Sequence, residues 1–204
     1  MSKKQIAFSI IIIAILLDQI VKIYIKTSFR LFEEVEVFDW FIIKFVENNG
    51  MAMGMEFGGK TGKLFLTLFR LAIVPLILYW IFDSLKKNLP TIAIISISLI
   101  FAGAIGNIID SVFYGVIFDD STSTVATLFS DNPYGTIFYG KVVDMFYFPI
   151  IENGTFPSWI PFVGGDNFTF FNYIFNLADS YISVGVALLF IFSKQAFPKE
   201  IKKP

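Results

Sequence analysis

The chain has 204 residues, of which 55% are hydrophobic and 16% charged, and its formal net charge is −1. Soluble domains carry about 25% charged residues, so this composition indicates an integral membrane protein. The sequence has no cysteine and no histidine, which excludes disulfides, thiolate chemistry, histidine-ligated zinc and histidine-based nucleophilic pairs. The nearly balanced charge also gives no basic surface for nucleic acid, so we expect no nucleic-acid partner.

Four segments are long and apolar enough to cross a bilayer, which takes about 20 helical residues. They are residues 6–25, 64–82, 91–113 and 170–192. The sequence therefore predicts a membrane all-α fold, with one integral membrane domain over residues 1–204 built as a four-transmembrane-helix bundle.

The distribution of basic residues predicts the orientation of this bundle. Basic side chains are retained on the cytoplasmic side of membrane proteins. Segment 114–169 contains one basic residue, Lys141, whereas lysines gather at both termini and in the loop between the second and third spans. We therefore expect cytoplasmic termini and two outer segments, 26–63 and 114–169. The lysines on the predicted cytoplasmic side are Lys3, Lys4, Lys86, Lys87, Lys194, Lys199, Lys202 and Lys203.

Both outer segments have the composition of ordered structure. Residues 34–47 alternate apolar and polar side chains and are rich in β-branched and aromatic types, which predicts short strands, and residues 48–50 (Asn-Asn-Gly) predict a turn. Residues 114–169 mix Gly, Pro and aromatic residues. We expect a small extracytoplasmic β cradle and an aromatic-rich outer loop at the level of the lipid headgroups.

Several polar residues lie inside the predicted spans, where an ionisable side chain costs about 2.5–3.5 kcal/mol. Asp18 and Lys22 are four residues apart and are expected to pair on one helix face. The asparagines favour hydrogen bonds between helices, and the glycines favour close helix approach. Most of these residues fall in the outer halves of the spans. They are Asp18, Lys22, Arg70, Gly103, Gly106, Asn107, Asp110, Asn176 and Asp179.

Two carboxylates are better candidates for a catalytic role than for a structural one. Asp144 lies in the apolar run VVDMFYF and Asp179 in the last span, and neither is directly adjacent to a basic residue in the sequence. Apolar surroundings raise the pKa of a carboxyl group, which suits a general acid or base. Arg70, in contrast, is expected to snorkel or to pair with a carboxylate.

The order of motifs resembles that of the bacterial lipoprotein signal peptidase family, also called signal peptidase II. Five segments carry this resemblance and span nearly the whole chain: LDQIVK at 17–22, NNGMAMG at 48–54, GAIGNIID at 103–110, GKVVDMF at 140–146 and FNLADSYISVG at 175–185.

The resemblance implies an aspartyl protease that removes the signal peptide of diacylglyceryl-modified prolipoproteins, cutting just before the lipidated cysteine. It implies Asp144 and Asp179 as the catalytic pair, without a metal or cofactor. Two neighbouring carboxyls share one proton and activate a water molecule, which suits this chemistry. The residues implied in substrate binding or support are Asn48, Gly50, Gly103, Asn107, Asp110, Asn176, Ala178, Asp18 and Lys22.

The resemblance also implies a place and partners: the bacterial cytoplasmic (inner) membrane, a site near the outer leaflet, contacts with membrane lipid, and inhibitors of the globomycin type. Nothing in the sequence demands more than a monomer. The chain departs from the family pattern at Met51, Met53 and Met145, and at Ser111, where the pattern has arginine. Residues 116–139 look like an insertion whose role, a lid, a partner surface or a spacer, stays open.

Three other functions compete with this one. A Ser-Lys protease with Lys22 and Ser111 needs no histidine. A proton- or ion-coupled transporter would use intramembrane Asp and Lys residues, although the carboxylates here gather near one interface and do not form a relay across the bilayer. The third is a membrane scaffold without catalysis.

Overall fold

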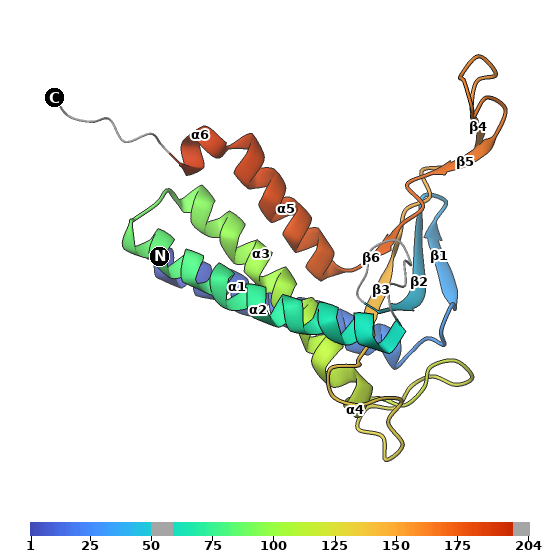
Figure 1. Ribbon diagram of the computed structural model, residues 1–204, viewed down its shortest axis with the longest axis horizontal. Coiled ribbons are helices and arrows are strands. Elements are labelled where there is room, and N and C mark those ends of the chain that lie inside the picture. The colour runs from blue at the N-terminus through green and yellow to red at the C-terminus, as the bar shows by residue number, and fades with distance from the viewer. Residues whose placement is uncertain (50–58, 198–204) are drawn as a thin grey trace.

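The computed structural model describes residues 1–49 and 59–197. Long helices form one side of the molecule and the strands lie at one end of them (Figure 1). The long helices are α1 (Lys3–Lys26), α2 (Gly59–Lys86), α3 (Thr91–Ile109) and α5 (Leu177–Ile191). Among the described helices, α1, α2 and the segment Thr91–Ile117 are long and apolar enough to cross a membrane.

The third span is longer than the expected 91–113. After α3 the chain continues through a π-helical turn, η2 (Asp110–Tyr114), into the short helix α4 (Gly115–Ile117). Pro90 precedes the first helical residue, where its missing N–H removes no helical hydrogen bond. The π turn widens the helix at Asp110, one of the polar residues singled out in the sequence.

The expected fourth span, 170–192, is wrong at its beginning. The helix α5 starts at Leu177, and the residues before it form the strands β5 (Asn167–Phe170) and β6 (Ile174–Phe175). Apolar aromatic residues suit strands as well as membrane helices, so hydropathy alone does not separate the two. The helix begins where Asn176 caps it, and the short helix α6 (Ser193–Ala196) follows.

The predicted strands in residues 34–47 are confirmed. β1 (Glu34–Phe38) and β2 (Phe41–Asn48) pair antiparallel, and β2 continues through the predicted beginning of the turn to Asn48. β2 also pairs with β3 (Val142–Tyr147), which pairs with β6. The resulting sheet has the order β1-β2-β3-β6. β4 (Ile151–Thr155) and β5 form a separate two-stranded ribbon that projects beyond it (Figure 1).

Helix α3 is the centre of the helical part, because it packs against α5, α1 and α2. Two of its glycines permit this contact. A Cβ atom on Gly103 would overlap the carbonyl oxygen of Ala178, and a Cβ atom on Gly106 would lie 2.5 Å from Asp18 Oδ2. The glycine pair therefore allows α1 and α5 to approach α3 closely.

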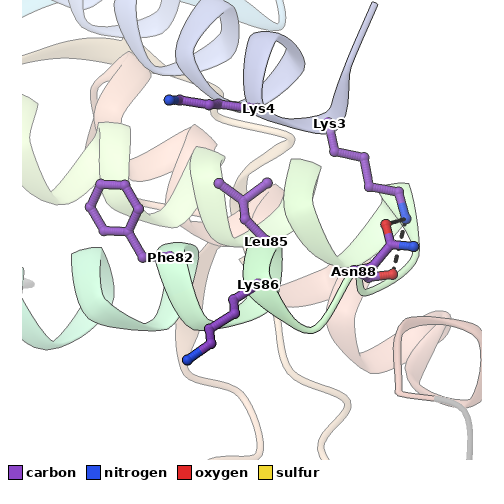
Figure 2. Close-up of a pocket in the computed structure, with 6 residues that line it drawn as sticks. All are labelled: Lys3, Lys4, Phe82, Leu85, Lys86 and Asn88. Carbon is purple, nitrogen blue, oxygen red and sulfur yellow. Dashed lines mark hydrogen bonds between the residues drawn. The ribbon is translucent and has the colours of Figure 1, made fainter.

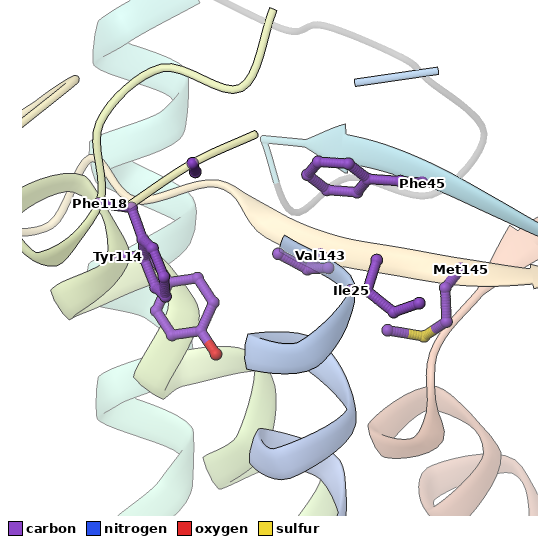
Figure 3. Close-up of a cluster of buried hydrophobic side chains, with 7 residues drawn as sticks. Ile25, Phe45, Tyr114, Phe118, Val143 and Met145 are labelled. Atoms are coloured by element: carbon purple, nitrogen blue, oxygen red, sulfur yellow. The ribbon is translucent and has the colours of Figure 1, made fainter. Parts of the chain in front are cut away.

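A buried hydrophobic cluster joins the sheet to the helix ends (Figure 3). Ile25 comes from α1, Phe45 from β2, Tyr114 from η2 and Val143 from β3. The segment after α4, which looked like an insertion, adds to the cluster; its contributions are Phe118 and Ala126. This core fixes the sheet, and with it Asp144, against the helices.

Candidate active site

Asp144 lies in the middle of β3, opposite Val46 of β2, and is 4% exposed. Its two carboxylate oxygens accept hydrogen bonds from two amides. The amide of Asn176 donates to Oδ1 at 2.6 Å, and the amide of Asn48, at the end of β2, donates to Oδ2. Strand pairing and the start of α5 thus hold this carboxylate from both sides.

Asp179 is held by the cap of its own helix. Asn176 is the N-cap of α5, and its Oδ1 accepts from the backbone N–H of Asp179 at 2.9 Å. Asp179 Oδ2 accepts in return from the Asn176 backbone N–H, which completes a capping box. Asp179 Oδ1 accepts from the amide of Asn107 on α3 at 2.8 Å. The carboxylate is therefore fixed by local helix chemistry and by one neighbouring helix.

The two aspartates belong to one network. The Asn176 amide donates to Asp144 and also to Asn107 Oδ1, at 3.1 Å. Asn107 in turn donates to Asp179. Three asparagines, Asn48, Asn107 and Asn176, therefore orient both carboxylates, and all three were singled out in the sequence.

The environment of Asp144 favours its protonated form. Burial raises the pKa of this carboxyl to about 8, and the negative charge of Asp179 acts in the same direction. Lys22 and the two amide donors oppose the increase without cancelling it. A carboxyl with this pKa retains its proton at neutral pH, as a general acid requires.

Lys22 is at the centre of a second cluster, which shares Asn107 with the aspartate network. Its ammonium group forms the expected ion pair with Asp18 at 3.0 Å, and another with Asp110 at 2.8 Å. It also donates to Asn107 Oδ1 at 3.0 Å. Asp18 Oδ1 accepts from the backbone N–H of Ala178 at 2.9 Å, so α1 is bound to the first turn of α5.

Asp110 connects the helices to the sheet. Its Oδ2 accepts from the backbone N–H of Val143, the residue before Asp144, at 3.2 Å. Gln19, which the sequence interpretation did not treat as a site residue, donates to Asp110 Oδ1 at 3.0 Å, to Asp18 Oδ2 and to the Gly106 carbonyl. Its position between Asp18 and Lys22, in the motif at 17–22, was the feature of the sequence that could have identified Gln19 as a site residue.

The remaining sequence-predicted residues do not all fall in this network. Gly103 and Ala178 shape the contact between α3 and α5, and the backbone N–H of Ala178 donates to Asp18 rather than to Asp144 or Asp179. Gly50 lies outside the described residues. Ser111 is buried and donates to the Asn107 carbonyl at 2.9 Å, so it forms no pair with Lys22.

The acidic side chains of the described residues also bear on whether the site could bind a metal. Within residues 1–49 and 59–197, no set of three acidic side chains is arranged to hold a metal ion.

A cavity of about 470 Å³ lies at the other end of the helices, lined by Lys3, Lys4, Phe82, Leu85, Lys86 and Asn88 (Figure 2). It does not include any residue of the aspartate network.

Comparison with known proteins shows the family of this chain. The family described as "Signal peptidase (SPase) II" matches residues 10–195. A lipoprotein signal peptidase of Porphyromonas gingivalis is 49% identical over 189 residues, which cover 92% of this chain and 82% of the relative. One from Amoebophilus asiaticus is 32% identical, covering 100% of this chain and 84% of the relative.

Solved structures agree on the fold. A structure titled as a bacterial membrane enzyme has a TM-score of 0.60 at 25% identity, and the match covers 97% of this chain and 93% of that one. A second with the same kind of title has a TM-score of 0.58, also at 25% identity. Nothing in these comparisons supports a transporter. The chain belongs to the signal peptidase II family, the bacterial inner-membrane aspartic proteases that process lipoprotein precursors.

Proposed function

We propose that Asp144 and Asp179 are the catalytic pair with which the chain cleaves prolipoprotein signal peptides. One observation carries this assignment. Asn176 binds Asp144 through its amide and Asp179 through its backbone N–H and side-chain oxygen. A single residue therefore orients both carboxylates from two distant segments of the chain.

The chemistry follows from two carboxyls that share one proton. Neighbouring carboxylates do not both ionise easily, so one remains protonated. The ionised carboxylate accepts a proton from a water molecule while the water oxygen attacks the scissile carbonyl carbon. The protonated carboxyl donates a hydrogen bond to the carbonyl oxygen, and the pair then protonates the departing amine as the C–N bond breaks. The titration belongs to the pair rather than to either residue.

Other residues supply orientation. Asn48 and Asn107 each donate to one catalytic carboxylate, so they orient the pair towards the substrate main chain. Lys22, Asp18 and Asp110 fix α1, α3 and β3 around the pair. Alanine at Asn48, Asn107 or Asn176 should therefore slow cleavage; wild-type rates in all three variants would contradict these roles.

The membrane context follows from the same arrangement. We place both termini in the cytoplasm, α5 as a fourth and shorter span, and the β1-β2-β3-β6 sheet at the outer leaflet, where the sheet forms the cradle for the lipid-bearing end of the substrate. The lysine bias supports this orientation. We propose a monomeric enzyme that is sensitive to globomycin-type inhibitors, which would compete with the substrate at the aspartate pair.

A gel-shift cleavage assay in detergent with a diacylglyceryl-modified prolipoprotein tests the catalytic pair. Wild type, Asp144→Asn and Asp179→Asn are compared in metal-free buffer, with the fold of each checked by thermal melting. We expect cleavage by the wild type alone, with at least a thousandfold loss in each variant, on the order of that for removing an essential acid or base. Cleavage by both folded variants would refute the assignment.

A further inference from the structure

The first half of α2 carries a polar face that points to the aspartate network. Lys63, Thr67 and Arg70 are four and three residues apart, so they lie on one side of the helix. Lys63 Nζ donates to the Asn49 carbonyl at 3.1 Å, and Thr67 Oγ1 donates to the Phe138 carbonyl at 3.3 Å. These contacts turn the face towards the end of β2 and towards the chain that leads into β3.

Arg70 lies one turn deeper along this face. Its Nη1 atom is sealed from solvent. Its positive charge interacts most strongly with Asp179, followed by Asp110 and Asp144. Arg70 as a whole is half-buried, and a guanidinium partly removed from water within a membrane protein is costly unless carboxylates oppose it. Arg70 thus faces the catalytic pair from a helix that supplies no other residue to it.

The other cations near the pair have different partners. Lys22 on α1 and Arg70 on α2 are the cations whose charges act on the pair. Asp18 and Asp110 lie around Lys22, Lys63 lies near Arg70 and Asp110, and Lys141 before β3 pairs with Glu47. Lys22 is bound by Asp18 and Asp110, and Lys63 by the Asn49 carbonyl. The position after Asp110, arginine in the family pattern, is the neutral Ser111, whose hydroxyl is bound within its own helix.

We propose that Arg70 is a positioning residue of the catalytic pair: its guanidinium opposes the charge of Asp179 and keeps the pair singly protonated at neutral pH. It provides from α2 the positive charge that position 111 lacks. This inference rests on the proposed function of Asp144 and Asp179.

The test is the pH profile of cleavage for full-length Arg70→Met, Arg70→Gln and Arg70→Lys, with Arg30→Gln as control. Arg30 is an exposed cation in the segment before the sheet, where it pairs with Glu33. Loss of a nearby cation makes a carboxylate harder to ionise. Both limbs of the kcat profile should therefore move to higher pH by about 1 unit or more in the Met and Gln variants. In Arg70→Lys and Arg30→Gln they should remain at the wild-type positions.

The outcomes separate this inference from the assignment of the pair. Unmoved limbs in a folded neutral variant would make Arg70 a structural residue, even while Asp144→Asn and Asp179→Asn abolish cleavage. Cleavage by those two asparagine variants would refute the pair itself. Arg70→Gln keeps a hydrogen-bonding side chain and serves where Arg70→Met does not fold.

A second, independent observation concerns the cavity at the other end of the helices (Figure 2). Lys4 on α1 and Lys86 on α2 line it, and Lys3 donates to the Asn88 side chain at its rim. Among its described lining residues none is acidic. Phe82 and Leu85 supply an apolar wall, and the site lies at the ends of two membrane-spanning helices, the level of lipid headgroups.

We infer that this cavity binds the phosphate of an anionic phospholipid. Basic pockets between the ends of transmembrane helices attract anionic headgroups, and each nearby lysine contributes. The three lysines supply positive charge around the cavity, which attracts the negative phosphate. The apolar wall of Phe82 and Leu85 meets the first carbons of the acyl chains.

Native mass spectrometry of the full-length enzyme in neutral detergent, with phosphatidylglycerol, phosphatidylcholine or inorganic phosphate added, tests this inference. Phosphatidylglycerol should remain bound, at least about tenfold more tightly to the wild type than to Lys4→Gln/Lys86→Gln. The control Arg30→Gln/Lys60→Gln removes two cations elsewhere and should bind like the wild type. Equal binding by the Lys4/Lys86 variant, or the same occupancy with phosphate alone, would overturn the lipid site.

Discussion

At the residue scale, Asn176 has two tasks that usually belong to different residues. Its side-chain oxygen and backbone N–H cap α5, and its amide binds Asp144 on the sheet. An N-cap side chain normally satisfies only the free N–H groups of its helix. Here the cap also defines the geometry between two carboxylates, so the beginning of one helix determines the alignment of the active site.

The raised pKa of Asp144 gives a prediction about pH. Because its carboxyl is protonated below about 8, the pair carries one proton at neutral pH and loses it as the pH rises through that value. Cleavage should therefore fall above about pH 8. A kcat profile from pH 5 to 10 with the lipidated substrate measures this limb, and activity that still rises at pH 9.5 would contradict the prediction.

The same pKa shift gives a matched prediction for stability. A carboxyl whose folded pKa exceeds its unfolded value binds more protons when folded, so its contribution to stability is lost as pH rises towards the folded pKa of about 8. The Tm of the wild type minus that of Asp144→Asn should decrease between pH 5.5 and 8.5. A difference that stays constant across this range would contradict it.

The sequence predicted the Asp18–Lys22 pair for a local reason, whereas the roles of Asn48 and of the aspartate pair came from the family resemblance. Asp18 and Lys22 are one helical turn apart, so helix geometry alone predicted their ion pair. The contact between Asn48 and Asp144 joins residues from distant segments through strand pairing, and no local spacing encodes that register. Gln19 carries no charge, so the cost of ionisable residues in a membrane did not single it out.

At the scale of elements, the contact between α3 and α5 depends on Gly103. Any side chain there meets the Ala178 carbonyl, which is two residues from Asn176. Gly103→Val should therefore separate the helices and lower Tm by several degrees with loss of cleavage. Gly135→Ala is the control, because its added Cβ would meet only ordinary contacts, from 3.5 Å. Wild-type Tm and cleavage in Gly103→Val would show that the helices tolerate the side chain.

The joint between α1 and β2 contains a buried ion pair. Lys26 is fully buried and pairs with Glu47, next to Asn48, and donates to Ser121 at 2.8 Å. Glu47→Gln leaves the buried lysine without its carboxylate, which costs about 3–5 kcal/mol. Glu34→Gln, in the more exposed pair with Lys44, should cost less than about 1 kcal/mol. Thermal melts of both variants decide the matter; similar Tm changes would contradict the prediction.

The boundaries of the elements show where hydropathy stops being informative. It located α1, α2 and α3 because each is a long apolar run. It placed the start of the fourth span seven residues before the start of α5, because the strands β5 and β6 are also apolar. The asparagine that ends this run was visible in the sequence, and a capping argument at Asn176 would have placed the start of α5 correctly.

At the scale of the whole molecule, the absence of cysteine makes the proposed orientation easy to test. Single cysteines at Ser2 and at Ser123, in the segment after α4, create the only thiols in the chain. In intact cells a membrane-impermeant maleimide should label Ser123→Cys and leave Ser2→Cys unlabelled. The reverse pattern would invert the topology.

The same arrangement has a consequence for how the enzyme is made. Chains emerge from the ribosome from the N-terminus, and domains form as their segments arrive. Asp144 is synthesised before Asn176 and Asp179, which arrive with α5, the last long helix described. A nascent chain that has not reached α5 holds one aspartate without its partner. With Asp144 and Asp179 as the proposed catalytic pair, a chain that ends before α5 lacks one of the two carboxylates and should not cleave prolipoproteins.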